Sequence, residues 1–145
     1  MATFFSVFPA GTVWGNDLAG QGYDVVLLGS AEPVTIDVDA LETKLRRPDF
    51  RNAAASLREV GFRSGSQLLA TYAGDAPSLG IWLKDAVLNR DRNLRLQYLA
   101  GLGLNLSQGM FIYDDMLSRR RYPRGLYLGS PKTLEAMRKA AGLGP

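Results

Sequence analysis

The chain of 145 residues contains no cysteine and no histidine. Without cysteine there are no disulfides, no thiolate metal sites and no thiol nucleophile. Without histidine the commonest general base and the commonest metal ligand are both missing. Carboxylates would have to bind any metal alone, and no acidic cluster has the spacing of a calcium-binding loop. We therefore expect no metal site.

Long apolar runs are also missing. No stretch approaches the roughly 20 apolar residues that span a membrane. Residues 1–5 offer neither the basic region nor the long apolar region of a signal peptide. We therefore expect a cytoplasmic protein with no membrane partner.

Charge is unevenly distributed along the chain. Residues 1–83 hold 6 Lys and Arg against 9 Asp and Glu, a net charge of −3, and residues 84–145 hold 11 against 5, a net charge of +6. The basic half could meet an acidic protein, a nucleic acid or the acidic half of a neighbouring copy. Of these partners, nucleic acid is the least favoured, because no known nucleic-acid-binding motif is present.

The densest basic run contains four arginines, and it is a candidate anion-binding site. These residues are Arg119, Arg120, Arg121 and Arg124. They could bind phosphates, with Tyr122 stacking on a base. The interpretation that we favour is a solvated or self-paired face, because arginine is also favoured near the C-terminus of a helix. Asp115 is expected to face Arg119 one helical turn away.

The apolar pattern predicts an α+β fold in a single domain, residues 1–145. A short helix over residues 2–8 ends at Pro9, and its apolar character on all sides predicts that it is buried. Strands at residues 11–14 and 23–29 are expected to form an antiparallel hairpin with a loop of about eight residues. Two strands alone are marginal in water and leave open edges, so we expect this hairpin edge to pair with a partner.

A predominantly helical body is expected over residues 33–145, after the helix and hairpin of residues 1–32. Each expected helix begins near a residue that caps helices or ends near Gly or Pro. The expected caps are Asp37 or Asp39 for the first helix, Ser64 or Ser66 for the third and Ser130 for the last. The expected helices cover residues 37–45, 50–60, 64–74, 78–86, 107–120 and 130–142. Tyr72 is assigned to the third helix, and Met110, Tyr113 and Leu117 to one stripe of the fifth.

Residues 89–101 combine charge and side-chain amides ahead of an alternating apolar stretch. Asp91 could bind a cationic amine, but the interpretation that we favour is an ion pair with Arg92, Arg95 or a distant arginine that fixes the loop. Asn89 is expected to cap a turn with its side chain. We interpret the run as a junction strand or turn that anchors the helical body.

Two stretches resemble the spermidine synthase-like family of polyamine aminopropyltransferases. Phe8-Pro9, Trp14 and residues 22–30 resemble the end of the family's catalytic domain, where a helix with a Phe/Tyr-Pro pair leads into a terminal hairpin. Residues 89–98 are similar to an Asn-Thr-Asp-Asp-Arg-Pro-x-Leu-Glu-Tyr type of motif that closes many long members of the family. The positions that match this motif are Asn89, Asp91, Leu96 and Tyr98.

The resemblance implies a transferase that moves an aminopropyl group from decarboxylated S-adenosylmethionine to putrescine. The family binds this donor on a glycine-rich strand–turn–helix unit. No Gly-x-Gly-x-x-Gly occurs in this chain, and Gly101-Leu102-Gly103 is the nearest approach. The resemblance therefore implies a C-terminal part without its nucleotide-binding catalytic core, with no cofactor of its own and no expected activity alone.

Candidate substrate-binding residues follow from the same resemblance. They are Tyr23, Asp24, Asn89, Asp91 and Tyr98. In the family an aromatic residue near the hairpin lines the amine pocket, which gives Tyr23 its role. From the residue pattern alone, Tyr23 is instead expected to pack across the strands against Trp14.

Three functions remain open from the sequence. The leading hypothesis is a non-catalytic segment that assists assembly or completes the pocket of a polyamine aminopropyltransferase. Its expected partner at the hairpin edge is a second copy, giving a homodimer, or a missing catalytic domain. The alternative is an independent helical module that binds an acidic protein or nucleic acid through its basic half. The third hypothesis is a small enzyme that uses Asp91, Asp24 or Tyr23 on a polyamine-like substrate.

Overall fold

The computed structural model describes residues 1–142 except residues 19–20, 95–96 and 100–107, and it describes the backbone alone at residues 17–18 and 21–23. The α+β fold class is confirmed. The chain divides into two compact units that alternate along the sequence. The first unit is Met1–Glu32 with Ala73–Arg120, and the second is Pro33–Tyr72 with Arg121–Pro145.

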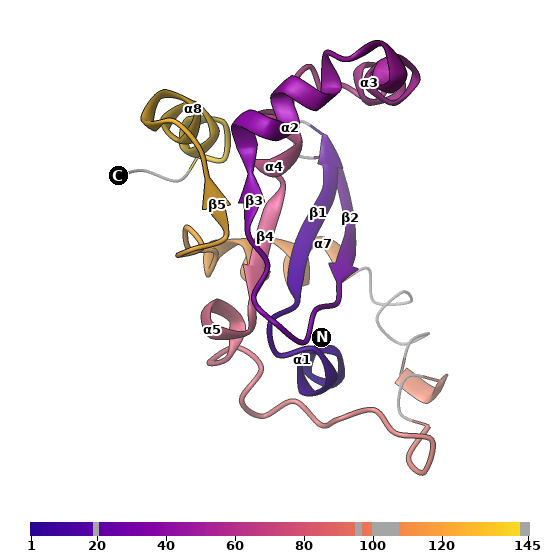
Figure 1. Ribbon diagram of the computed structural model, residues 1–145. Helices are drawn as coiled ribbons and strands as arrows, with labels where there is room; N and C mark the ends of the chain where they lie inside the picture. Colours follow the sequence, from indigo (N-terminus) through magenta and orange to yellow (C-terminus); the bar gives the residue numbers. More distant parts are fainter. Residues whose placement is uncertain (19–20, 95–96, 100–107, 143–145) are drawn as a thin grey trace. The chain divides into compact units, whose positions relative to one another are not determined.

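The first unit begins with α1 (Ala2–Val7), β1 (Thr12–Leu18) and β2 (Gln21–Leu28), and the two strands form the predicted antiparallel hairpin (Figure 1). The predicted eight-residue loop is wrong. The pairing continues through Asn16 opposite Asp24 and, after an irregularity, Leu18 opposite Gln21. Polar residues that suggested a turn therefore occupy the end of a longer ladder.

Helix α1 forms where it was predicted, but the expectation that it is buried is wrong. None of its residues is buried, and Val7 is 61% exposed. Its aromatic rings instead pack against one another, with ring centroids 5.2 Å apart for Phe4 and Phe5 and 5.4 Å apart for Phe4 and Phe8. A helix of only six residues is too short to bury all of its faces, so its side chains are only partly covered, and Phe5 packs against the core of the first unit.

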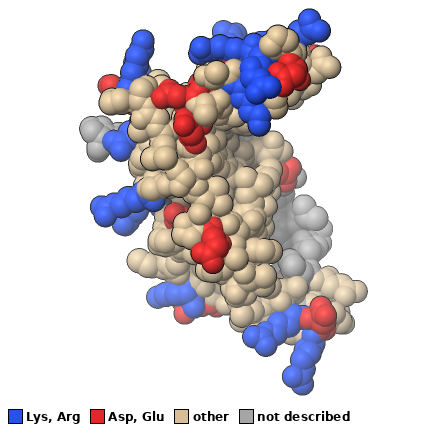
Figure 2. Space-filling view, in the orientation of Figure 1, with Lys and Arg blue, Asp and Glu red and all other residues tan. Residues whose placement is uncertain are grey.

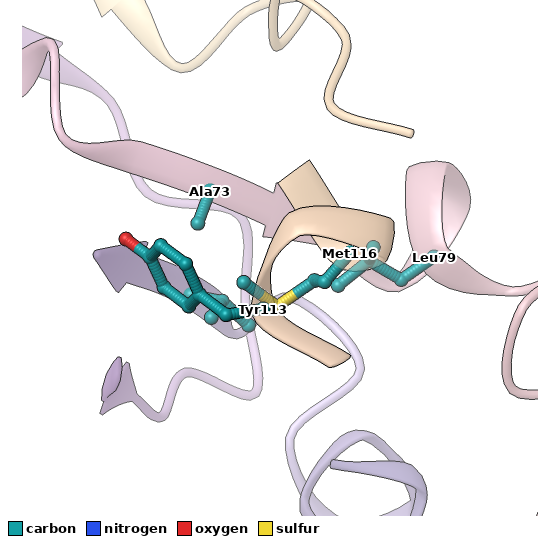
Figure 3. Packing of buried hydrophobic residues seen from close by; sticks show 5 residues of the cluster. Ala73, Leu79, Tyr113 and Met116 are labelled. Atoms are coloured by element: carbon teal, nitrogen blue, oxygen red, sulfur yellow. The ribbon is translucent and has the colours of Figure 1, made fainter. Parts of the chain in front are cut away.

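The core of the first unit is built from elements that are distant in the sequence. Its buried residues come from β1, β4 (Tyr72–Asp75), α5 (Ala76–Leu79) and α7 (Gly109–Ser118). They are Val13, Ala73, Leu79, Tyr113 and Met116. Figure 3 shows the Tyr113 and Met116 side chains of α7 lying beside Ala73 and Leu79. Burial of these side chains is the main force that holds the unit together.

The stripe predicted on residues 107–120 is partly wrong. Tyr113 is buried and Leu117 packs against the core, but Met110 is 41% exposed and Met116 takes the buried position instead. The cause is the start of the helix, which lies at Gly109, so Met110 falls in its first turn. The predicted pair of Asp115 and Arg119 is confirmed, with Arg119 Nη2 at 3.0 Å from Asp115 Oδ1.

The helix predicted at residues 78–86 is wrong in extent. It is replaced by the four-residue α5, followed by turns over residues 80–85. The Asp75 carboxylate accepts a hydrogen bond from the Ser78 backbone N–H at 2.9 Å, and the Ser78 hydroxyl accepts one from the Asp75 N–H at 3.0 Å. This reciprocal cap begins the helix earlier than Ser78 itself would have done. Trp82 and Leu83 pack against the core from these turns.

The second unit contains α2 (Val38–Leu45), a 3₁₀ turn (Pro48–Phe50), α3 (Arg51–Glu59), α4 (Gly65–Leu69) and α8 (Pro131–Ala140). Predicted caps are confirmed at three helix starts, because the side chains of Asp37, Ser64 and Ser130 each accept a backbone hydrogen bond from the first turn that follows. Helix α4 contacts both α2 and α8, which gives the unit a helical core.

Three short strands were not predicted. In the second unit β3 (Ile36–Asp37) pairs in parallel with β5 (Tyr127–Leu128). The assignment of Tyr72 to a helix is wrong, because it begins β4, where its ring lies 6.4 Å from that of Tyr127. Strands of two to four residues carry too little alternation to be recognised in a sequence.

The Asp39 carboxylate of α2 holds the start of α8. It accepts hydrogen bonds from the Ser130 backbone N–H at 2.5 Å and from the Thr133 hydroxyl at 2.6 Å. The Thr133 hydroxyl, followed by the Ser130 N–H, lowers the pKa of Asp39 from its ordinary value, because both groups stabilise the ionised carboxylate.

Candidate functional site

Strand β2 lies at the edge of the sheet formed by the described strands, whose order is β2-β1-β4 (Figure 1). Val26, Leu27 and Leu28 follow one another on this strand and are 48%, 38% and 53% exposed. Successive side chains of a strand point to opposite faces, so this edge places apolar surface on both faces. Such a run is typical of a strand that is covered on both faces.

An apolar groove of about 460 Å³ lies beside this edge in the first unit. Its walls come from the start of α1, from β2, from residues 83–89 and from Leu99. The lining residues are Met1, Ala2, Thr3, Phe4, Leu27, Leu83, Ala86, Val87, Asn89 and Leu99. Burial of the N-terminal amine lowers its pKa from the ordinary value, because the charged form is poorly solvated there.

Asn89 connects residues 89–101 to α1. Its backbone N–H donates to the Thr3 hydroxyl at 2.8 Å, across a wide sequence separation. The following turn is closed by the side chain of Asn93, whose Oδ1 accepts from the Arg90 N–H and whose Nδ2 donates to the Leu88 carbonyl, at 2.9 and 2.8 Å. The side chain of Asn93 therefore closes this turn.

The run of residues 89–101 is a turn at residues 91–93 and is helical at residues 97–99, and the rest of its second half lies outside the described residues. The hydrogen bond from Asn89 to Thr3 of α1 connects this run to the first unit, which contains the hairpin. Asp91 is exposed and makes no ion pair with any residue that the structure describes, so the predicted pair with Arg92 is absent. Arg95, another predicted partner, lies outside the described residues.

Of the candidate substrate-binding residues, Asn89 lines the groove. Asp24 is exposed on β2 opposite Asn16, and Tyr98 is 75% exposed. The side chain of Tyr23 lies outside the described residues. The backbone register places Val26 opposite Trp14, and the predicted packing of Tyr23 against Trp14 falls on a side chain outside the described residues.

The basic run spans the boundary between the units. Arg119 and Arg120 belong to the first unit, and Arg121 and Arg124 belong to the second. Arg119 is paired with Asp115 on α7, whose other carboxylate oxygen accepts from Trp82 Nε1 at 2.7 Å.

Tyr122, the predicted base-stacking residue, has its ring covered by Arg138. The guanidinium carbon of Arg138 lies 4.1 Å from the ring centroid. The Tyr127 ring lies 5.9 Å away from it in the same unit. These contacts favour an internal packing role for Tyr122.

Thr3 and Asn93 are structural residues that sequence reasoning missed. A threonine hydroxyl in the first turn of a helix carries no signal for a partner so far along the chain. The side-chain amide of Asn93 had a usable signal, since Asn closes turns by bonding nearby backbone groups. Among the described residues there is no group of three or more acidic side chains that could hold a metal. In that same part of the chain, no helix combines the length and apolar character needed to cross a membrane.

Comparison of the chain with protein-family models, with curated proteins and with solved structures found no match.

Proposed function

We propose that this chain is the non-catalytic C-terminal segment of a spermidine synthase-like protein, and that its hairpin completes the sheet of the catalytic part. The observation that carries the proposal is β2, an edge strand with Val26, Leu27 and Leu28 exposed. Edge strands with unpaired backbone groups readily accept another strand. The occupant that we assign to this edge is a strand of the catalytic domain.

The placement of the two resembling stretches supports this proposal. Residues 1–32 and residues 85–105 share a unit in their described parts, joined by the Asn89–Thr3 hydrogen bond. Such an arrangement is expected if the second stretch serves to brace the terminal hairpin. The sequence adds that no histidine or cysteine is present to act as a base or nucleophile.

The chemistry of the groove favours assembly over amine binding. Its described lining contains no acidic side chain, and burying a cationic amine without a charged partner is costly. The lining side chains are mostly apolar, and exposed apolar surface of this kind is typical of protein interfaces. We therefore assign the groove to contact with the catalytic part.

The test mixes the purified chain with the catalytic domain of a spermidine synthase-like protein that ends before its terminal hairpin. We expect a 1:1 complex by light scattering and higher aminopropyl transfer to putrescine than the catalytic domain shows alone. The double variant Val26→Lys with Leu28→Lys should abolish the complex, because two charged side chains would have to be buried at the new strand pair. The chain alone should not turn over putrescine and decarboxylated S-adenosylmethionine.

Val60→Lys is the matched control, since Val60 is 57% exposed in the second unit. It should leave the complex intact. A complex that survives the double variant would remove β2 as the interface. Turnover by the chain alone would overturn the non-catalytic assignment. The other outcome is a homodimer that the double variant dissociates, with no complex formed with the catalytic domain. In that outcome the partner of the β2 edge is a second copy of the chain.

A second candidate function is an independent module that binds an acidic partner. The specific observation is charge: the second unit holds 11 Lys and Arg against 6 Asp and Glu, a net charge of +5, and the first holds 6 against 8, a net charge of −2. A basic unit of this kind attracts anionic macromolecules. Binding of this kind weakens steeply as the salt concentration rises, and this dependence is its test.

A further inference from the structure

A second cavity, of about 220 Å³, lies in the second unit among α2, α3 and the residues that precede α4. Its lining combines three arginines with an apolar surface. The arginines are Arg46, Arg58 and Arg63, the apolar residues are Leu45, Ala54, Leu57 and Phe62, and Glu42 and Ser64 complete the wall. This cavity differs in chemistry from the apolar groove, which has no charged side chain in its described lining.

The three arginines have no acidic partner within the described part of the chain. The ion pairs there join Arg47 to Asp49, Lys84 to Asp85 and Arg119 to Asp115. Three guanidinium groups against one carboxylate give the lining a net charge of +2. A hollow lined mostly by one sign of charge concentrates the field and attracts counter-ions.

Glu42 is the one carboxylate in this lining, and it is hydrogen-bonded to Ser66. Its Oε1 accepts hydrogen bonds from both the backbone N–H and the hydroxyl of Ser66, each at 2.8 Å. Glu42 therefore has a structural role between α2 and α4, and among the described residues it makes no ion pair with these arginines. Figure 2 shows Lys and Arg gathered at the end of the second unit that carries α2 and α3.

We propose that this cavity binds a small organic phosphomonoester. Its phosphate would lie on the guanidinium groups, because the planar guanidinium matches two phosphate oxygens at once. A phosphomonoester carries a charge of about −1.5 to −2 at pH 7, which matches the net charge of the lining. Its apolar body would pack against Leu57 and Phe62.

The size of the cavity limits the ligand. Pockets for drug-sized molecules are about 300–1,000 Å³, so a cavity of 220 Å³ admits a single ring or a short chain beside the phosphate. The apolar wall distinguishes this site from one for inorganic phosphate, which would gain nothing from it. The proposal is independent of the assembly role, because every lining residue belongs to the second unit.

The test is calorimetric titration of the full chain at low ionic strength with phenyl phosphate, inorganic phosphate and phenol. We expect phenyl phosphate to bind more tightly than either of the others, because it alone can contact both the arginines and the apolar residues of the lining. Arg58→Gln should weaken phenyl phosphate at least about tenfold, the usual effect of losing a hydrogen bond to a charged group. Phe62→Leu should weaken phenyl phosphate and leave inorganic phosphate unchanged.

Arg51→Gln is the matched control, because it removes the same charge from α3 at a position outside the cavity lining. It should leave phenyl phosphate affinity within about twofold of the parent chain, since exposed charges contribute little at a distance. Equal weakening by Arg51→Gln and Arg58→Gln would overturn the site. If phenyl phosphate binds no more tightly than inorganic phosphate, the proposed contact between the ligand and the apolar residues of the lining is wrong. Arg46→Gln provides a second substitution in the cavity lining. Circular dichroism of each variant shows whether it is folded, and so separates lost binding from lost folding.

Discussion

At the scale of single residues, Asp39 shows how a capping signal acquires a tertiary role. The sequence marks Asp37 and Asp39 as alternative caps of one helix. The structure uses Asp37 for that cap, with its Oδ1 at 2.9 Å from the Ala40 N–H. Asp39 instead bonds Ser130 and Thr133 at the start of α8. The choice between the two depended on α8, which no local pattern around residue 39 reveals.

Asp39→Asn is expected to lower the stability of the second unit at neutral pH. The pKa of Asp39 is lowered in the folded chain, so its ionised form contributes stability above the unfolded pKa of about 3.9. This contribution is lost as the pH falls through the folded pKa. Urea unfolding at pH 7 and below about pH 3 should therefore show a difference between parent and variant that shrinks in acid.

The control for this prediction is Asp49→Asn, which breaks an exposed ion pair between Asp49 and Arg47. Exposed pairs of this kind contribute little, so we expect about 0–1 kcal/mol from it. A difference between the parent chain and Asp39→Asn that grows in acid would contradict the assigned role of Asp39.

At the scale of elements, the start of α5 depends on a reciprocal cap between Asp75 and Ser78. Asp75→Ala removes the acceptor for the Ser78 N–H and is expected to cost about 0.5–2 kcal/mol of unfolding free energy. Leu79 at the end of this helix is fully buried in the first unit's core, so the loss should appear in cooperative unfolding by urea. Thr133→Ser is the comparison variant. It lies in the second unit and keeps the hydroxyl, so we expect little change in the unfolding free energy. An Asp75→Ala variant as stable as the parent would show that packing of Leu79 alone fixes α5.

Elements with local signals were predictable, and elements defined by pairing were not. The caps at Asp37, Ser64 and Ser130 act within one turn, so the sequence reveals them. Strand β5 is defined by the pairing of Tyr127 with Ile36 on β3. A strand of two residues is too short to show an alternating pattern, so the sequence could not reveal it.

At the scale of the whole molecule, the two units carry net charges of opposite sign, as the two halves of the sequence do. The second unit has a net charge of +5 and the first a net charge of −2. If the second unit binds nucleic acid or an acidic protein, affinity must fall steeply with salt, because binding releases counter-ions. Fluorescence anisotropy with a labelled single-stranded DNA between about 50 and 200 mM salt measures this slope.

The basic run provides the variants for this measurement. Substituting Arg121 and Arg124 by Gln should reduce the salt slope by roughly one unit for each phosphate that is no longer neutralised. Arg119→Gln is the control, since Arg119 is paired with Asp115 in the first unit. Affinity without a steep salt dependence would remove the physical basis of the basic module.

The sequence by itself determined the fold class, the hairpin and the main helix starts, and it excluded the chemistry that histidine and cysteine would have supplied. These features depend on composition or on interactions within a few residues. The tertiary structure alone decided that residues 73–120 join the hairpin, that Asn89 meets Thr3 and that Arg46, Arg58 and Arg63 surround one cavity. Each of those depends on which distant segments pack together, and burial of apolar surface, which has no directional code in the sequence, drives that packing.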